Sequence, residues 1–237
     1  MKLKTSKTKQ EVAVNFSRYL ALVIASTETV HIALSGGSTP KVVFDELAID
    51  FQTEIDWQGV HLYWGDERCV DPTDDDSNYK MTLEHLISKI DIPEENIHRI
   101  KGENEPDYEA NRYAEVLNEN LPKTNGIPQF DLIILGMGDD GHTASIFPHE
   151  IGLWGSDSYC EVATHPDSGQ KRVSITGQLI NNAKAVVFLV TGESKAEKVK
   201  EIIGREDGYE KYPASLVRPD SGKLLWFLDE AAAAKIK

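Results

Sequence analysis

Short apolar runs alternate with helix-like segments along the whole chain, and this alternation restricts the folds that the chain can adopt. The strand candidates are rich in β-branched and aromatic residues and cover 30–34, 60–64, 97–100, 130–135, 172–176, 185–191 and 224–228. The intervening segments at 12–24, 40–47, 78–87, 108–120 and 194–203 read as helices, and 178–182 reads as a turn or a short helix. Near-continuous apolar strands separated by helices are typical of a parallel sheet that is covered on both faces.

We therefore expect an α/β fold with a doubly wound, mostly parallel, Rossmann-like sheet and helices on both faces. No linker, repeat or low-complexity block divides the chain, so we expect a single domain over 1–237. In such sheets ligands bind beyond the carboxyl ends of the strands. The loops that follow the predicted strands are therefore where functional residues should lie.

The charge balance limits the partners that the chain can bind. Its 237 residues include 25 Lys and Arg against 39 Asp and Glu, a formal net charge of −14. A nucleic-acid binder needs clustered basic residues, so this balance argues against one. It also disfavours an anionic substrate unless a local group of basic residues overrides the overall charge.

Cellular location follows from weaker signals. No apolar run approaches the roughly 20 residues that a membrane span needs. The apolar stretch 19–25 continues the helical spacing of 12–24, so we interpret it as part of an amphipathic helix and not as a signal peptide. Cys69 and Cys160 cannot form a disulfide framework and are expected to be reduced. We expect a cytoplasmic protein with no membrane partner.

The first loop whose residues could bind a ligand is SGGSTP at 35–40, between a strand and a helix. Gly36 and Gly37 allow a ligand to approach the backbone closely, and Ser38 and Thr39 add hydroxyl donors. Free N–H groups at a helix start favour an anion such as phosphate, with Pro40 expected at the first helical position. A plain tight turn with a capping serine explains the pattern equally well.

The second loop is GDER at 65–68, directly after the strand 60–64. Arg68 could grip a phosphate in a bidentate manner, although a surface ion pair with its acidic neighbours is the simpler alternative. The acidic residues at 71–76 that follow lack the spacing of a calcium loop and are expected to be solvated.

The third loop, 136–148, contains GxGxxG but does not fit a dinucleotide site, because Pro148 would end a following helix after about two turns. Glycines surround His142, and Asp140 lies two residues before it. A histidine near its intrinsic pKa of about 6.5 can accept a proton from water at neutral pH. A structural, cap-forming histidine is the alternative.

Other catalytic designs find less support in the sequence. The remaining histidines are scattered and HExxH is absent, so a zinc site is unsupported. The chain has no GxSxG, which disfavours a serine hydrolase with a nucleophile elbow. Ser145 is close to His142 in sequence, but a position inside a helix would give it a packing or capping role.

Together these motifs resemble those of the 6-phosphogluconolactonase family. SGGSTP at 35–40, GDER at 65–68, SNYKM at 77–81 and LGMGDDGHTASIFP at 135–148 match its signatures in order. RVSIT at 172–176, LINNA at 179–183, VTGESKA at 190–196 and PAS at 213–215 extend the resemblance over roughly residues 11–230. Ile146 and Ser174 stand where the family usually carries Leu and Thr, and both exchanges are conservative.

The resemblance implies hydrolysis of the sugar-phosphate lactone 6-phospho-D-glucono-1,5-lactone to 6-phospho-D-gluconate in the oxidative pentose phosphate pathway. It implies no cofactor and no metal, and a fold similar to glucosamine-6-phosphate deaminase and ribose-5-phosphate isomerase. By position, His142 corresponds to the general base and Asp140 to an acid that orients His142 or the substrate. The implied substrate contacts are Gly36, Gly37, Ser38, Thr39, Asp66, Arg68, Asn78, Arg172 and Lys195.

Oxyanion donors are a separate hypothesis, for which we consider the backbone N–H groups of 136–141 or the side chain of Lys195. The oligomeric state stays open between a monomer and a small homo-oligomer.

Two rival functions remain at this point. A sister amino-sugar deaminase or isomerase should carry a loop like GHIAFNEP where this chain has GHTASIFP at 141–148, which argues against it. A non-catalytic sugar-phosphate sensor should carry an additional DNA-binding or partner domain, for which 237 residues leave little space.

Overall fold

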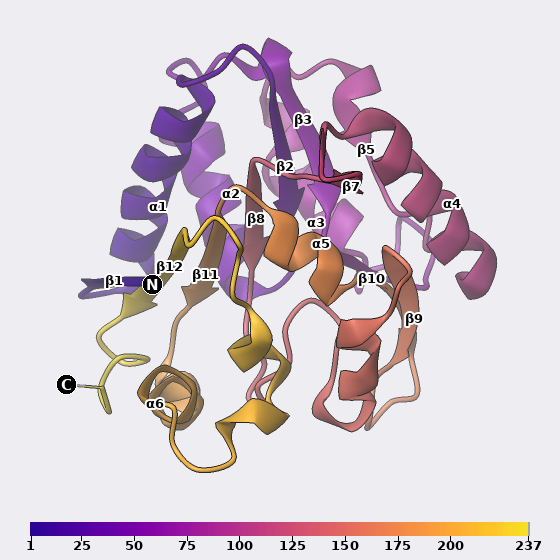
Figure 1. Ribbon diagram of the computed structural model, residues 1–237. Helices are drawn as coiled ribbons and strands as arrows, with labels where there is room; N and C mark the ends of the chain where they lie inside the picture. The colour runs from indigo at the N-terminus through magenta and orange to yellow at the C-terminus, as the bar shows by residue number, and fades with distance from the viewer. Residues whose placement is uncertain (237) are drawn as a thin grey trace.

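The computed structural model describes residues 1–236 and has a seven-stranded parallel sheet at its centre (Figure 1). The strand order is β1-β12-β11-β8-β2-β3-β5, and every neighbouring pair is parallel. The strands of this sheet are β1 (Lys2–Ser6), β2 (Val30–Leu34), β3 (Val60–Trp64), β5 (Ile97–His98), β8 (Leu132–Leu135), β11 (Val186–Val190) and β12 (Leu224–Asp229). This arrangement confirms the mostly parallel α/β fold.

Helices lie on both faces of the sheet. They are α1 (Lys9–Ile24), α2 (Ser38–Asp50), α3 (Asn78–His85), α4 (Pro106–Asn120), α5 (Gly177–Asn182) and α6 (Ala196–Gly204). Short 3-10 helices occur at η1 (Trp57–Gly59), η2 (Ile87–Lys89), η3 (Glu94–Asn96), η4 (Pro148–Gly155), η5 (Glu193–Lys195), η6 (Tyr209–Lys211) and η7 (Pro213–Leu216). Among residues 1–236, no helix combines the length and the apolar character that crossing a membrane requires.

The alternation of side chains along β12 separates these helices into two layers. Phe227 points toward α1, where its ring meets the ring of Phe16 edge to face at a centroid distance of 5.5 Å. Trp226 points to the opposite face, where it stacks on Phe188 of β11 at 4.0 Å and lies near α6. Both aromatic residues of β12 are buried, so each face of the sheet has its own apolar layer.

The expected topology is wrong in part, because the structure has a second, antiparallel sheet. It has the order β4-β10-β9, from β4 (Asp66–Arg68), β9 (Cys160–Thr164) and β10 (Lys171–Ile175). The strand predicted at 172–176 therefore belongs to this sheet and not to the parallel one, and GDER forms a strand where a loop was expected. The N–H of Ile175 donates to the carbonyl oxygen of Gly65 at 2.9 Å, which fixes the point where the chain leaves the main sheet.

Strands β1 and β9 were not predicted either. β1 is a polar edge strand, and β9 (CEVAT) mixes polar and apolar residues, so neither carries the continuous apolar pattern of the central strands. A two-stranded ribbon of β6 (Lys123–Thr124) and β7 (Ile127–Pro128) completes the strands.

Candidate active site

A hollow of about 200 Å³ lies beyond the carboxyl ends of β2, β3, β8 and β11. Because β11, β8, β2 and β3 are consecutive in the sheet, the loops after them meet at one edge. Every residue predicted for the site lines this hollow except Asp140. The predicted residues in its wall are Gly36, Gly37, Ser38, Thr39, Asp66, Arg68, Asn78, His142, Arg172 and Lys195.

The loop between β2 and α2 forms one wall. Gly37 has a φ of 108°, which favours glycine, and it caps a helix that begins at Ser38, two residues earlier than the expected start at Pro40. A Cβ on Gly36 would lie 1.8 Å from the amide oxygen of Asn78, so only glycine allows Asn78 its present position. No side chain caps the start of α2, and the residues at this helix start line the hollow.

His142 and Asp140 form a hydrogen-bonded pair in the loop after β8. The Nδ1 of His142 lies 2.7 Å from Oδ1 of Asp140, and the same oxygen accepts the backbone N–H of His142 at 3.1 Å. Burial would raise the pKa of Asp140, but the hydrogen bonds and charge of His142 outweigh it and lower the pKa to about 2. An ionised carboxylate only accepts, so Nδ1 must carry the proton and Nε2 of the neutral ring is left as an acceptor.

The segment after His142 is not a helix, contrary to the expectation. Ala144 adopts a left-handed φ of 48°, and Thr143 and Ile146 form an isolated antiparallel bridge. The hydroxyl of Thr143 donates to the carbonyl oxygen of Gly136 at 2.8 Å and closes the loop on itself. This turn carries Ser145 beneath the hollow, where its buried hydroxyl donates to Oδ2 of Asp66 at 2.6 Å. The predicted position of Ser145 inside a helix is therefore wrong; the residue is fully buried, as a packing role requires, and its hydroxyl also holds a predicted site residue.

Arg68 and Arg172 are direct cross-strand partners in the small antiparallel sheet. Like charges in this position repel each other, and burial together with the charge of Arg68 lowers the pKa of Arg172. Among residues 1–236, neither guanidinium forms an ion pair within 4.0 Å, and the Nε of each is buried without a hydrogen-bond partner. Two close, unneutralised guanidinium groups at the edge of a hollow are suited to a doubly charged anion.

Lys195 enters the hollow from η5, after β11. Its ammonium lies 2.7 Å from Oδ1 of Asp139, and this contact lowers the pKa of Asp139. Within the loop of 136–141, the N–H of Gly138 donates to the carbonyl oxygen of His142 and the N–H of Gly141 donates to that of Gly138. These two N–H groups are therefore occupied, and the other N–H groups of the loop and the side chain of Lys195 remain as candidate oxyanion donors.

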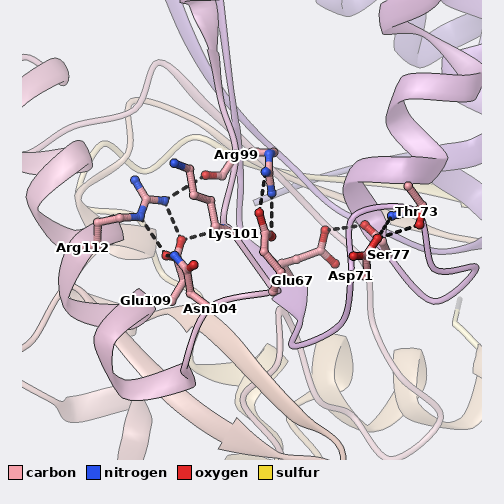
Figure 2. A network of polar contacts seen from close by, with 10 residues as sticks. Glu67, Asp71, Thr73, Ser77, Arg99, Lys101, Asn104, Glu109 and Arg112 are labelled. Atoms are coloured by element: carbon pink, nitrogen blue, oxygen red, sulfur yellow. Dashed lines mark hydrogen bonds and ion pairs between the residues drawn. The ribbon is translucent and has the colours of Figure 1, made fainter.

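The sequence reasoning missed Glu67, a buried carboxylate behind the hollow (Figure 2). It accepts the hydroxyl of Ser77 at 3.1 Å and the backbone N–H groups of Asn78 at 2.8 Å and Tyr79 at 2.7 Å, at the start of α3. It also accepts the backbone N–H of Arg68 at 2.8 Å. Burial raises the pKa of Glu67, and these donors oppose that rise. The signal in the sequence was Glu67 of GDER, followed ten residues later by Ser77, a serine that could cap a helix.

Three histidines that looked unrelated in sequence stack in one row across β2, β3 and β5. The rings of His31 and His61 lie 4.9 Å apart, and those of His61 and His98 lie 5.4 Å apart. His98 also stacks on the buried ring of Tyr63 at 4.4 Å. Within the described residues, no group of three or more His, Cys, Asp or Glu side chains is arranged to hold a metal ion.

The fold and the hollow define an open α/β protein in which a histidine and two arginines line one hollow beyond the carboxyl ends of the strands. Comparison with known proteins gives the family. The chain belongs to the family described as glucosamine-6-phosphate isomerases/6-phosphogluconolactonase, whose model matches residues 4–226.

Similar proteins span nearly all of the chain. A 6-phosphogluconolactonase of Haemophilus influenzae is 48% identical over 204 residues, which are 86% of this chain and 86% of that protein. One of Aggregatibacter actinomycetemcomitans is 42% identical over 230 residues, or 97% of each chain. The solved 6-phosphogluconolactonase of Trypanosoma brucei has a TM-score of 0.87 at 28% identity and covers 100% of this chain and 98% of that one. These matches confirm the resemblance that the motifs suggested.

Proposed function

We propose that the chain hydrolyses 6-phospho-D-glucono-1,5-lactone to 6-phospho-D-gluconate. The observation that carries this proposal is that one hollow holds both a histidine with an acceptor nitrogen and two unneutralised guanidinium groups. The names of the similar proteins support the same reaction.

His142 is the proposed general base. With Nδ1–H donated to Asp140, its Nε2 can take a proton from a water molecule as that water attacks the lactone carbonyl. A δ-lactone is an activated ester, so attack by water needs no covalent enzyme intermediate. Asp140 keeps the ring in the required tautomer and stabilises the imidazolium that forms, a role that resembles the carboxylate of a serine-protease triad.

Arg68 and Arg172 are the proposed holders of the 6-phosphate. A phosphate between them would replace the repulsion of the two guanidinium groups by charge-assisted hydrogen bonds. Asn78 and the loop from Gly36 to Thr39 line the same hollow and are proposed to meet the remaining oxygens of the substrate. Fixing the phosphate at one end of the substrate would hold the lactone carbonyl at the other end in the orientation that attack by water requires.

Lys195 is the proposed stabiliser of the oxyanion. It lies in the wall of the hollow, and its ammonium is already held in position by Asp139. A positive charge at the carbonyl oxygen would stabilise the tetrahedral intermediate.

The test follows lactone hydrolysis by the purified protein in real time, with the spontaneous rate in buffer subtracted. We expect saturable turnover, a fall of about 10²–10⁴-fold in kcat for His142→Ala, and no such fall for His85→Ala in α3, outside the hollow. Release of ammonia from glucosamine 6-phosphate by the native protein, without lactone turnover, would replace this proposal with the deaminase function.

A further inference from the structure

A second hollow, of about 280 Å³, shares no lining residue with the active-site hollow. Its walls come from Met1, the last turn of α6, η6 and η7, and the start of β12; apart from Met1, these segments lie in the orange and yellow part of Figure 1. Leu224 is the first residue of β12, so this hollow is nearer the amino end of that strand, whereas the active site lies at the carboxyl ends.

The walls contain two buried polar side chains without partners. Ser215 is 6% exposed and Trp226 is 1% exposed, and neither the hydroxyl oxygen nor the indole Nε1 has a hydrogen-bond partner among the described residues. Leaving such a group unpaired costs free energy, and most buried polar groups in proteins find a partner. Both residues line the hollow, so an occupant that accepts hydrogen bonds would offer these buried groups a partner after a small rearrangement of the wall, because the indole N–H can only donate.

Among residues 1–236, the charged side chains that line this hollow are basic. Arg205 and Arg218 are both exposed and line it, and none of its lining residues is Asp or Glu, although the chain carries a net charge of −14. Neither arginine forms an ion pair with any of residues 1–236; the guanidinium of Arg218 meets only the hydroxyl of Tyr209, at 3.1 Å. Two unneutralised cations favour an anionic occupant.

The rest of the wall is apolar. The side chains of Ile202, Val217 and Leu224 surround the indole of Trp226 and would cover the body of a bound molecule. A concave, largely apolar surface with a few polar groups is the usual form of a small-molecule site. We propose that this hollow is a second binding site, for a small anion that carries an apolar body and presents its charge to Arg205 and Arg218.

A hydrogen bond connects the wall of this hollow to the loop that carries His142. The N–H of Ala214, which lines the second hollow, donates to the carbonyl oxygen of Gly141 at 3.1 Å. The ring of the neighbouring Tyr212 packs on Gly141 so closely that a Cβ there would lie 2.7 Å from it. An occupant that contacts Ser215 would therefore press on the residues that support His142.

The experiment uses 8-anilinonaphthalene-1-sulfonate as the probe and N-phenyl-1-naphthylamine, which has the same rings without the sulfonate, as its neutral counterpart. We expect the folded protein to bind the sulfonate saturably at one site, and the neutral compound about tenfold more weakly or worse. An excess of 6-phosphogluconate should not displace the probe, since it belongs to the other hollow. This expectation holds whether or not the lactonase proposal is correct.

Variants locate the binding. Arg218→Ala should weaken sulfonate binding about tenfold, whereas Arg18→Ala, an exposed arginine on α1, should leave it unchanged. Ser215→Ala should also weaken binding, yet it should not lower the melting temperature of the free protein, because it removes an unpaired buried hydroxyl.

Three results would overturn the proposal. The first is equal binding of the sulfonate and its neutral counterpart, and the second is native affinity in both Arg218→Ala and Ser215→Ala. The third is that the hollow is covered by a second copy of the chain: the probe would then fail to bind, and Arg218→Glu would lower the molecular mass measured by light scattering.

Discussion

The hydroxyl of Ser145 donates a hydrogen bond of 2.6 Å to Oδ2 of Asp66, and both residues are buried. This bond joins the loop after β8, which carries His142, to the small antiparallel sheet that carries Arg68. The backbone N–H of Ser145 is held in turn by the hydroxyl of Ser174 on β10, at 3.1 Å. The two sides of the active site therefore depend on one serine for their relative position.

Ser145→Ala should lower both stability and activity. Loss of the hydroxyl leaves a buried carboxylate oxygen without its donor, which costs about 1–3 kcal/mol in the free energy of unfolding. Urea unfolding measures the first effect and lactone hydrolysis the second, with a fall in kcat/KM expected. Ser158→Ala, whose side chain is exposed, is the matched control and should change neither quantity. Native kcat/KM in Ser145→Ala would mean that Asp66 needs no such support.

Asp140→Asn should lower kcat by about 10²–10⁴-fold and change KM little. An asparagine can present its N–H₂ to Nδ1, which would move the ring proton to Nε2 and remove the acceptor that the proposed mechanism needs. Steady-state kinetics at neutral pH measures the effect. Asp157→Asn alters an exposed carboxylate that does not line the active-site hollow and should leave kcat unchanged. Equal losses in the two variants would contradict the tautomer argument.

Arg172→Ala should abolish most of the preference for a phosphorylated lactone. A charge-assisted hydrogen bond contributes about 1.5–3 kcal/mol, so kcat/KM for 6-phosphogluconolactone should fall by about 10- to 150-fold. Hydrolysis of unphosphorylated glucono-1,5-lactone should change far less, because that substrate lacks the group that the arginine holds. A parallel loss with both substrates would assign Arg172 a structural role, through its packing on the ring of Phe147 at 5.5 Å.

The row of His31, His61 and His98 should make the fold sensitive to mild acid. Burial, the largest cause, lowers the pKa of His31 and of His98 to about 4 and also lowers that of His61. The unfolded chain binds protons at these sites near pH 6.5, whereas in the folded protein His31 and His98 do so only near pH 4 and His61 at a pH below its usual range. The unfolded state thus holds more protons in this range, so their contribution to stability is complete above pH 6.5 and is lost as the pH falls toward 4.

His98→Phe tests the row directly. Phenylalanine can keep the stacking on Tyr63, which lies at 4.4 Å, but it cannot titrate. The free energy of unfolding in urea should therefore decline less steeply between pH 7 and pH 5 than in the native protein. Of the charged groups near His31, Asp131 opposes the lowering of its pKa and Lys184 adds to it, and both remain in the variant. His149→Asn, at an exposed histidine, should keep the native pH dependence.

The sequence predicted the features that continuous local patterns encode. The apolar runs of β2, β3, β8 and β11 marked four neighbouring strands, and the loops after them contain His142 and Arg68. The contacts that hold the site together could not be predicted from the sequence, because they join segments that are far apart in the chain. Ser145 and Asp66 are 79 residues apart, and the cross-strand pairing of Arg68 with Arg172 depends on a sheet whose strands carry mixed polar and apolar residues.

Helix signals were misleading at Ser145 for a physical reason. The left-handed backbone at Ala144 and the hydrogen bond from Thr143 to Gly136 produce a closed turn. An alanine gives no sign of a positive φ, which ordinarily calls for glycine or asparagine. The tight turn is therefore a product of tertiary contacts and not of local propensity.

Glu67→Gln tests whether Glu67 positions Arg68 and Asn78 for the substrate in addition to stabilising the fold. Its carboxylate accepts bonds from Arg68, Ser77, Asn78 and Tyr79, and thereby fixes the start of α3 against β4. A glutamine offers one acceptor oxygen in place of two, so part of this set loses its partner at a cost of about 1–3 kcal/mol. The displaced backbone of Arg68 and Asn78 should raise KM for the phosphorylated lactone, with a smaller effect on kcat.

Glu109→Gln is the matched control, because Glu109 is an equally buried carboxylate with a full set of donors (Figure 2). It accepts the backbone N–H of Lys101 at 2.6 Å, the amide of Asn104 at 2.7 Å and the guanidinium of Arg112, but it does not line the active-site hollow. Both variants should lose stability in urea, and only Glu67→Gln should raise KM. If the two variants shift KM equally, Glu67 acts only through global stability; if Glu67→Gln loses stability with native KM, the start of α3 does not place Arg68 and Asn78 for the substrate.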